Sequence, residues 1–304
     1  MDYTAWKPTL NFRYHSIMSI DVNKTYKLFI NGSFQRTESG RYYEKYSADN
    51  TFLANLPKAS RKDIRNAVQY ARAAQSSWQE RTAYNRSQIV YRIAEMLRQE
   101  DERFIKLLQF EGLSKSEAHS SFSEAIDLLV HLAGWCDKFI QVTGTVNPVA
   151  SSHFNFSTPE ATGVVCTNTA AENGLKSVVH SVIPALCGGN TVVCLAENND
   201  LLALDFSEIL SNSDFPPGTV NILTGSMEEL GEHMARHMDV NALCLWDIDK
   251  DMEVKLENFA LENMKRVNFN QDNSVSGLDL IMNFQEIKTT WHPIDRIDGS
   301  GSGY

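Results

Sequence analysis

The sequence lacks any apolar run of the roughly 18 residues that a transmembrane helix requires. Residues 1–20 also lack a basic segment followed by an apolar core, so we expect no signal peptide. Basic residues are in the minority, with 28 Lys and Arg against 38 Asp and Glu and a net charge of −10. Nucleic acids and anionic membrane surfaces both attract basic faces, so we expect neither kind of partner.

Cysteine is scarce and follows no recognisable motif. The chain has 5 cysteines, an odd number, and no two of them have the C-x-x-C spacing. The number and spacing of the cysteines therefore predict neither a disulfide framework nor a zinc site. Cys166, Cys194 and Cys244 each lie in an apolar run, where a thiol acts as a small hydrophobic group. This usage favours a reducing compartment such as the cytoplasm.

The N-terminal part of the chain is mainly helical in pattern. The whole chain has 304 residues, of which 42% are apolar, and it suffices for one large domain or two ordinary ones. Asn31-Gly32 between β-forming residues predicts a hairpin near residues 27–34. Ser60 and Asp63 form a capping-box-like helix start. Apolar residues at helical spacing predict further helices up to about residue 139.

From residue 163 onward, short apolar strands alternate with helices. We expect strands at 163–166, 190–195, 220–224 and 240–246, and helices at 175–186, 200–210, 227–237 and 251–264. This alternation requires crossover connections and a mostly parallel sheet covered on both faces. The predicted fold class is therefore α/β, with a Rossmann-like doubly wound parallel sheet and an N-terminal helical segment.

Two strand-like segments, residues 153–157 and 284–291, lie outside this alternation. A lone strand cannot stabilise itself, so we expect them to pair with each other or with another subunit. Residues 1–26 are weakly patterned and are interpreted as an arm. The Gly- and Ser-rich residues 295–304 are interpreted as a flexible tail.

The order of several motifs resembles that of aldehyde dehydrogenases: KLFINGSF, PALCGGNTVV, FPPGTVNILTG and the tail FQEIKTTWHP. TAYNRSQIVYRIAEML, FNFSTPEATGVV and KTTWHP look more narrowly like the C-terminal half of two-part family-16 aldehyde dehydrogenases and its free-standing bacterial relatives. The resemblance spans about residues 25–294. It implies an NAD-binding-type domain at 27–143 and 158–270, and a small β oligomerisation element at 144–157 and 283–294.

The resemblance also implies that the family's catalytic domain is absent, because Val267 leads almost directly to the terminal strand. None of the cysteines falls at the family's nucleophile. The family's general base falls on Asn270, whose amide cannot act as a base. Its oxyanion-binding Asn falls near Glu172, whose charge would repel a developing oxyanion.

The cofactor positions of the family are altered as well. Its ribose-binding Lys falls on or beside Leu195, although Glu197 is retained and is suited to a ribose hydroxyl. Its glycine-containing turn falls on residues 245–248, which include Asp247. A bound pyrophosphate needs close backbone approach and no negative charge at such a turn. We therefore expect no cofactor, with NAD as the only candidate.

Other side chains suggest chemistry less strongly. His233 and His237 have metal-ligand spacing, but a third ligand is not evident, so we expect an exposed helix face and no metal. Glu172 and His180 suggest an acid–base pair, but a helix N-terminus stabilised by Glu172 is the simpler interpretation. The acidic residues of 247–253 lack the pattern of a calcium loop and are interpreted as a solvated turn.

These observations lead to one main hypothesis and two alternatives. The main hypothesis is a catalytically inactive aldehyde-dehydrogenase-like protein that oligomerises with itself, with an active aldehyde dehydrogenase or with a larger assembly. The predicted interface residues are His153, Phe154, Phe156, Phe284, Ile287, Thr289 and Trp291. One alternative is an NAD-dependent oxidoreductase of aldehydes whose partner supplies the missing domain. The other is a nucleotide-binding regulator that uses the carboxyl edge of the sheet.

Overall fold

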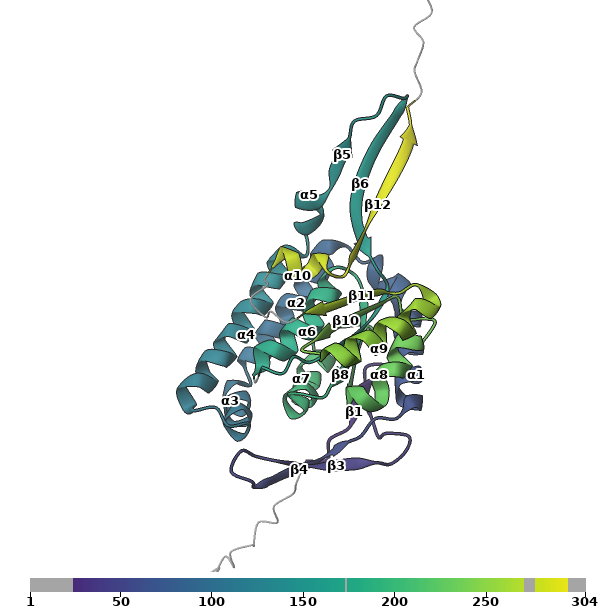
Figure 1. Ribbon diagram of the computed structural model, residues 1–304. Coiled ribbons are helices and arrows are strands. Elements are labelled where there is room, and N and C mark those ends of the chain that lie inside the picture. The colour runs from purple at the N-terminus through teal and green to yellow at the C-terminus, as the bar shows by residue number, and fades with distance from the viewer. Residues whose placement is uncertain (1–23, 173, 271–276, 295–304) are drawn as a thin grey trace, which may run out of the picture.

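The computed structural model describes residues 24–172, 174–270 and 277–294. Most of the predicted arm at 1–26 and all of the predicted tail at 295–304 lie outside the described residues. A seven-stranded sheet forms the centre of the molecule, and a narrow three-stranded arm projects from it (Figure 1).

The central sheet has the strand order β11-β10-β7-β8-β9-β1-β2. Its parallel strands are β7 (Val164–Asn168), β8 (Thr191–Ala196), β9 (Val220–Thr224), β10 (Ala242–Trp246) and β11 (Arg266–Asn270). At one edge, β1 (Leu28–Ile30) pairs antiparallel with β9 and with β2 (Ser33–Gln35). The order of the parallel strands is that of a Rossmann-like doubly wound sheet, so the predicted fold class is confirmed. The strand order reverses between β7 and β10.

Helices cover both faces of this sheet (Figure 1). One face carries α1 (Arg61–Gln79), α8 (Met227–Arg236), α9 (Lys250–Ala260) and the 3₁₀ turn η1 (Leu261–Asn263). The other carries α6 (Leu175–Cys187) and α7 (Asp200–Ser211), with α2 (Ala83–Arg98), α3 (Asp101–Phe110) and α4 (Lys115–Trp135) packed outside them. Short helices α5 (Phe139–Thr143) and α10 (Leu278–Met282) lie where the arm joins the body.

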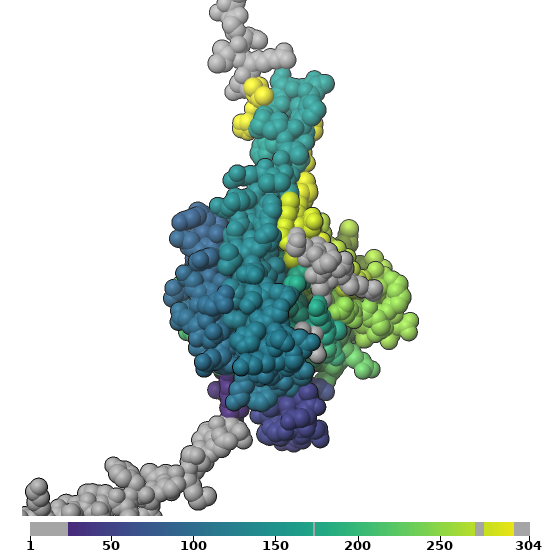
Figure 2. All heavy atoms as spheres, turned by 90° about the vertical axis from the view of Figure 1, so that its left-hand side faces the viewer, coloured from purple at the N-terminus to yellow at the C-terminus, as the bar shows by residue number. Residues whose placement is uncertain are grey.

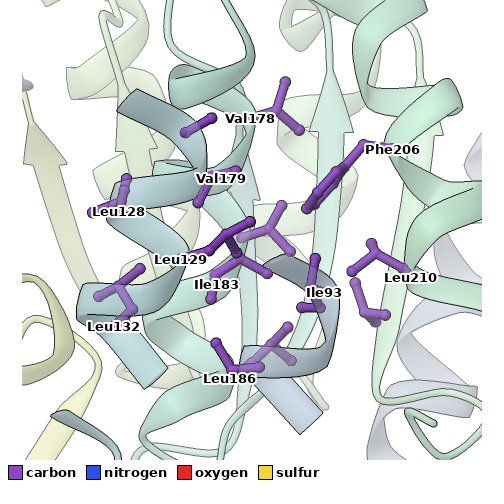
Figure 3. Close-up of a cluster of buried hydrophobic side chains, with 14 of the residues drawn as sticks. Ile93, Leu128, Leu129, Leu132, Val178, Val179, Ile183, Leu186, Phe206 and Leu210 are labelled. Atoms are coloured by element: carbon purple, nitrogen blue, oxygen red, sulfur yellow. The ribbon is translucent and has the colours of Figure 1, made fainter. Parts of the chain in front are cut away.

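The larger core cluster lies between the sheet and the helices α2, α4, α6 and α7. Ile93, Leu129, Ile183 and Phe206 come from these four helices and point toward one another (Figure 3). Neighbouring residues of a strand point to opposite faces of the sheet. Cys194 of β8 therefore belongs to this cluster, whereas Leu195 packs in the second cluster under α1 and α8.

The hairpin predicted near residues 27–34 is present as β1 and β2. Asn31 and Gly32 form its turn with φ values of 54° and 69°. This left-handed pair matches the twist of the strands, which is why Asn-Gly is favoured there. The capping box of Ser60 and Asp63 at the start of α1 is also present.

A second hairpin, β3 (Tyr42–Tyr46) and β4 (Phe52–Pro57), was not predicted from residue patterns. Strand β3 has no buried residue, and β4 buries Ala54, Leu56 and Pro57 without the strict alternation of apolar and polar residues that predicts a half-buried strand. Ala54 and Leu56 of β4 nevertheless anchor it on Leu201 and Leu204 of α7.

The projecting arm consists of β5 (Thr145–Asn147), β6 (His153–Ala161) and β12 (Gln285–Pro293), in the order β12-β6-β5 (Figures 1 and 2). The prediction that the two isolated strand segments pair with each other is therefore right. Strand β6 runs beyond the predicted boundary at residue 157, since Gln285 of β12 still pairs with Ala161. Among the described residues, no helix is both long and apolar enough to cross a membrane.

The prediction that Phe284 belongs to an oligomer interface is wrong. Its side chain is 0% exposed and belongs to the main core cluster. Its carbonyl oxygen accepts hydrogen bonds from the Thr162 hydroxyl and the Asn190 amide. Because α10 ends just before Phe284 and β12 begins just after it, this residue fixes the base of the arm to the body.

Candidate functional site at the carboxyl edge of the sheet

The point at which strand order reverses is where doubly wound sheets bind ligands, outside the carboxyl ends of the strands. In this molecule it lies between Asn168, the last residue of β7, and Trp246, the last residue of β10. The Asn168 side chain bridges the two strands. Its Oδ1 accepts from the Trp246 backbone amide at 2.8 Å, and its Nδ2 donates to the Trp246 carbonyl at 3.0 Å.

Asp247 reinforces this closure. Its Oδ2 accepts a hydrogen bond from the Ala171 backbone amide at 2.7 Å. Its own amide donates to the Asn270 carbonyl, and its backbone is left-handed with φ 53°. A backbone amide of the loop between β7 and α6, the part of this fold that meets a bound phosphate, is thus already taken by a carboxylate.

The same loop is tied to the end of β8 by Asn199. The Asn199 side chain accepts from the Gly174 amide at 3.0 Å and donates to the carbonyl oxygens of Ala170 and Glu172. The Thr169 hydroxyl donates to the Asn198 carbonyl. Sequence reasoning did not single out Asn168 or Asn199. The signal available was an Asn at or shortly after the end of each of two buried strands, since Asn168 ends β7 and Asn199 lies three residues beyond Ala196, the end of β8.

Glu172 and His180 have different surroundings. Glu172 lines a surface pocket of about 230 Å³ together with Glu117, Glu124 and Lys176. His180 is 2% exposed inside α6, with its ring 4.6 Å from that of Trp246. Since α6 begins only at Leu175, Glu172 precedes the helix, as the simpler interpretation of this residue required.

The predicted cofactor positions have other contacts in the structure. Leu195 is 0% exposed and lies in the core. Glu197 accepts a hydrogen bond from the Met227 amide at 2.9 Å, at the first residue of α8. It therefore caps that helix in place of Ser226, whose side chain makes no capping bond. These residues, with Asp247, do not fit NAD in the pose its pyrophosphate and ribose require.

Of the groups considered for catalysis, the cysteines are buried and Asn270 is hydrogen-bonded. All five cysteines are free and buried. Burial raises the pKa of the Cys166 and Cys244 thiols to about 12, so both are un-ionised and unreactive at neutral pH. Asn270 donates from its side-chain amide to Cys244 Sγ at 3.2 Å.

Metal ligation finds no support in the described residues. In residues 24–172, 174–270 and 277–294, no group of three His, Cys, Asp or Glu side chains is arranged to hold an ion. The acidic run after β10 is structural. Asp249 caps α9 by accepting from the Met252 amide, and the buried Glu253 pairs with Lys250 at 2.6 Å. The solvated-turn interpretation was therefore wrong for Glu253, which is 5% exposed.

The fold is a dinucleotide-binding-type sheet, and where its strand order reverses, Asn168 and Asp247 hydrogen-bond to backbone groups of neighbouring segments. The family model for the aldehyde dehydrogenase family matches residues 34–266, so the chain belongs to that family.

The relatives it matches are longer proteins. A putative aldehyde dehydrogenase DhaS of Bacillus subtilis is 29% identical over 80% of this chain and 50% of its own length. Aldehyde dehydrogenase, cytosolic 1, of Macroscelides proboscideus is 30% identical over 83% of this chain and 51% of its own length. The chain thus spans about half the length of the curated relatives it matches.

Solved structures agree with this assignment. The structure of a Bacillus cereus aldehyde dehydrogenase in complex with NAD⁺ superimposes with a TM-score of 0.76 and 26% identity, covering 82% of this chain and 51% of that one. The catalytic domain of the family is thus missing from the matched half.

Proposed function

We propose that this chain is a catalytically inactive aldehyde dehydrogenase family member that works by assembling with another protein chain through its β5-β6-β12 arm. The partner is a second copy of the chain or a related aldehyde dehydrogenase. The observation that carries the proposal is the exposure of apolar side chains on the arm. Val146 is 67%, Ile287 55% and Trp291 57% exposed. Burying apolar surface of this kind against a partner lowers the free energy of the complex.

The backbone of β12 offers a second reason for assembly. Strand β12 is an edge strand, and within the described chain it pairs only with β6. An edge strand presents unpaired amide and carbonyl groups, which a strand from another chain satisfies.

The predicted interface residues divide between the two faces of the arm, because side chains alternate along a strand. Ile287, Thr289 and Trp291 share one face with His153, whose ring lies 5.8 Å from that of Trp291. The opposite face carries Phe154 and Phe156, with rings 5.5 Å apart, next to Val146 of β5. A partner that contacts one face need not contact the other, so the faces can be tested separately.

The absence of catalysis is supported by the chemistry of the site. Residues 271–284, which separate β11 from β12, are far too few for the catalytic domain that the resemblance requires there. The closed crevice supports the absence of NAD binding.

The free cysteines support a reducing compartment such as the cytoplasm.

The test is a charge substitution on one face of the arm. We expect Ile287→Glu with Trp291→Glu to dissociate the assembly, because two carboxylates cannot be buried unpaired at an apolar contact. Light scattering after size-exclusion chromatography measures the mass of the parent and of the variant. Val254→Glu is the matched control, since Val254 is 48% exposed on α9, which is not part of the β5-β6-β12 arm.

A parent that elutes as a monomer, alone and when mixed with an active aldehyde dehydrogenase, would refute the proposal. So would an arm variant whose assembly matches that of the control. Aldehyde-dependent NADH formation by the purified chain would instead favour the oxidoreductase alternative.

A further inference from the structure

A groove of about 210 Å³ lies between α1 and α8, on the face of the sheet opposite the large core. Arg61, Ile64 and Arg65 line it from α1. His233, Arg236 and His237 line it from α8 and the residue that follows it. This basic groove has no part in the site described above. Helix α8 leaves the carboxyl edge after β9 and reaches the amino edge at His237.

The residue spacing explains why these side chains converge. On both helices the lining positions are i, i+3 and i+4, which place three side chains on one helical face. Ile64 is only 1% exposed, whereas Arg61 and Arg65 on either side of it are exposed. The groove thus has an apolar floor and cationic walls.

The charges of the groove are only partly balanced. Arg236 is neutralised by Glu232 at 2.9 Å and by Glu262 at 2.8 Å. By contrast, neither Arg61 nor Arg65 forms an ion pair or a side-chain hydrogen bond with any described residue. Asp63, the acidic residue between them in sequence, is buried and accepts hydrogen bonds from Thr37 and Ser60. The chain carries a net charge of −10, so unpaired guanidinium groups side by side are unexpected.

The surroundings add positive charge. Lys265 donates from Nζ to the carbonyl oxygens of Val240, at 2.8 Å, and His237. Burial lowers the pKa of His237, and the charges of Lys265, Arg65 and Arg72 lower it further against the opposing effect of Asp239. These charges make the groove a region of positive electrostatic potential, which a bound anion would neutralise.

We infer that this basic groove binds the phosphate group of a small phosphate monoester. Guanidinium groups hold phosphate through paired N–H donors in a planar fork, which suits Arg61 and Arg65. His237 Nδ1 already accepts a hydrogen bond from the Asp239 backbone amide at 3.2 Å, so Nε2 is the nitrogen of this ring that can donate to phosphate. The His233 ring offers a further donor from the same wall. A volume of about 210 Å³ is below the roughly 300 Å³ at which pockets for larger ligands begin, so the groove holds the phosphate and little more.

Histidine NMR tests this inference on the full chain. Inorganic phosphate, and then glycerol phosphate, are titrated at pH 7 with chloride adjusted to keep the ionic strength constant. We expect saturable shifts of the His233 and His237 ring protons, assigned from His233→Gln and His237→Gln. We also expect the pKa of His237 to rise when phosphate is bound, because a bound anion favours the imidazolium form.

The test variant is the double variant Arg61→Gln with Arg65→Gln. The control variant is Arg98→Gln, since Arg98 is exposed on α2 and lies outside the groove. We expect the double variant to weaken phosphate binding by at least about tenfold and the control to leave it unchanged. Circular dichroism and the melting temperature confirm that the variants fold. Shifts that do not saturate, or that chloride reproduces, would overturn the inference, and so would equal phosphate affinity in the parent and the double variant.

Discussion

At the scale of single residues, the carboxyl edge of the sheet is held by side chains that bond to backbone groups of neighbouring segments. Asn168 satisfies both backbone groups of Trp246, a residue 78 positions away in sequence. Asp247 occupies the Ala171 amide. A buried backbone group left without a partner costs about 1–3 kcal/mol, so these side chains stabilise the closed edge. The same residues that would obstruct a nucleotide therefore contribute to folding.

Lys265 allows a prediction about pH at this scale. Its amine bonds only to the backbone carbonyls of His237 and Val240 among the described residues, and burial lowers its pKa from 10.5 to about 8. Between pH 8 and 10.5 the unfolded chain holds a proton that the folded chain has released. Because the unfolded state then binds more protons, this group makes stability rise with pH in that window, and the gain is lost as pH falls toward 8.

The measurement is the free energy of unfolding in urea at pH values from 7.5 to 10. We expect the parent to gain stability with pH relative to Lys265→Met, which lacks the titrating group. Parallel pH profiles for the two proteins would show that the pKa of Lys265 is not lowered in the folded state.

At the scale of secondary-structure elements, Glu197 links two of the predicted βα units. Its carboxylate, at the end of β8, caps α8 through the Met227 amide. We expect Glu197→Ala to lower the free energy of unfolding by about 1 kcal/mol, the usual cost of losing a helix cap. Hydrogen exchange at the Met227 amide should accelerate in the same variant.

Glu228→Ala provides the comparison for that prediction. Glu228 is exposed in the first turn of α8, and its removal weakens only the interaction with the helix dipole. Equal losses of stability in the two variants would contradict a capping role for Glu197.

The elements also show what sequence patterns can predict. Buried strands such as β9, Val220–Thr224, and the Asn31-Gly32 turn were predicted because burial and left-handed backbone conformations leave local signals. The β3–β4 hairpin leaves little local signal, since β3 has no buried residue and β4 is held by contacts with α7. The cross-links made by Asn168 and Asn199 were missed for the same reason: their partners are distant in sequence. Phe284 was wrongly assigned to the interface because it directly precedes the exposed strand β12, and the sequence does not show that its side chain turns into the core.

At the scale of the whole molecule, the chain belongs to the aldehyde dehydrogenase family and spans about half the length of the relatives it matches. The two sites proposed above lie at separate places. The arm presents apolar side chains, and the basic groove presents Arg61 and Arg65, which have no ion-pair partner among the described residues. The proposed recognition surfaces thus lie away from the carboxyl edge, where sheets of this fold class bind ligands.

The closed edge leads to a prediction for NAD⁺. A site with a dissociation constant of about 10 µM would add about 2.7 kcal/mol of stability at about 1 mM NAD⁺. Each kcal/mol raises the melting temperature of a domain of this size by about 2–4 °C. Because Asp247 and Glu197 already occupy backbone amides at the edge, we expect a change of less than about 1 °C, measured by differential scanning fluorimetry.

An active aldehyde dehydrogenase treated identically is the positive control for this measurement. A rise of several degrees in this chain would mean that the edge opens to admit the cofactor, and it would contradict the loss of the dinucleotide site. Asp247→Ala separates the causes of a small change. If its carboxylate is what excludes NAD⁺, the variant should show a larger shift than the parent. If the bridges made by Asn168 and Asn199 suffice to close the crevice, the variant should behave as the parent does.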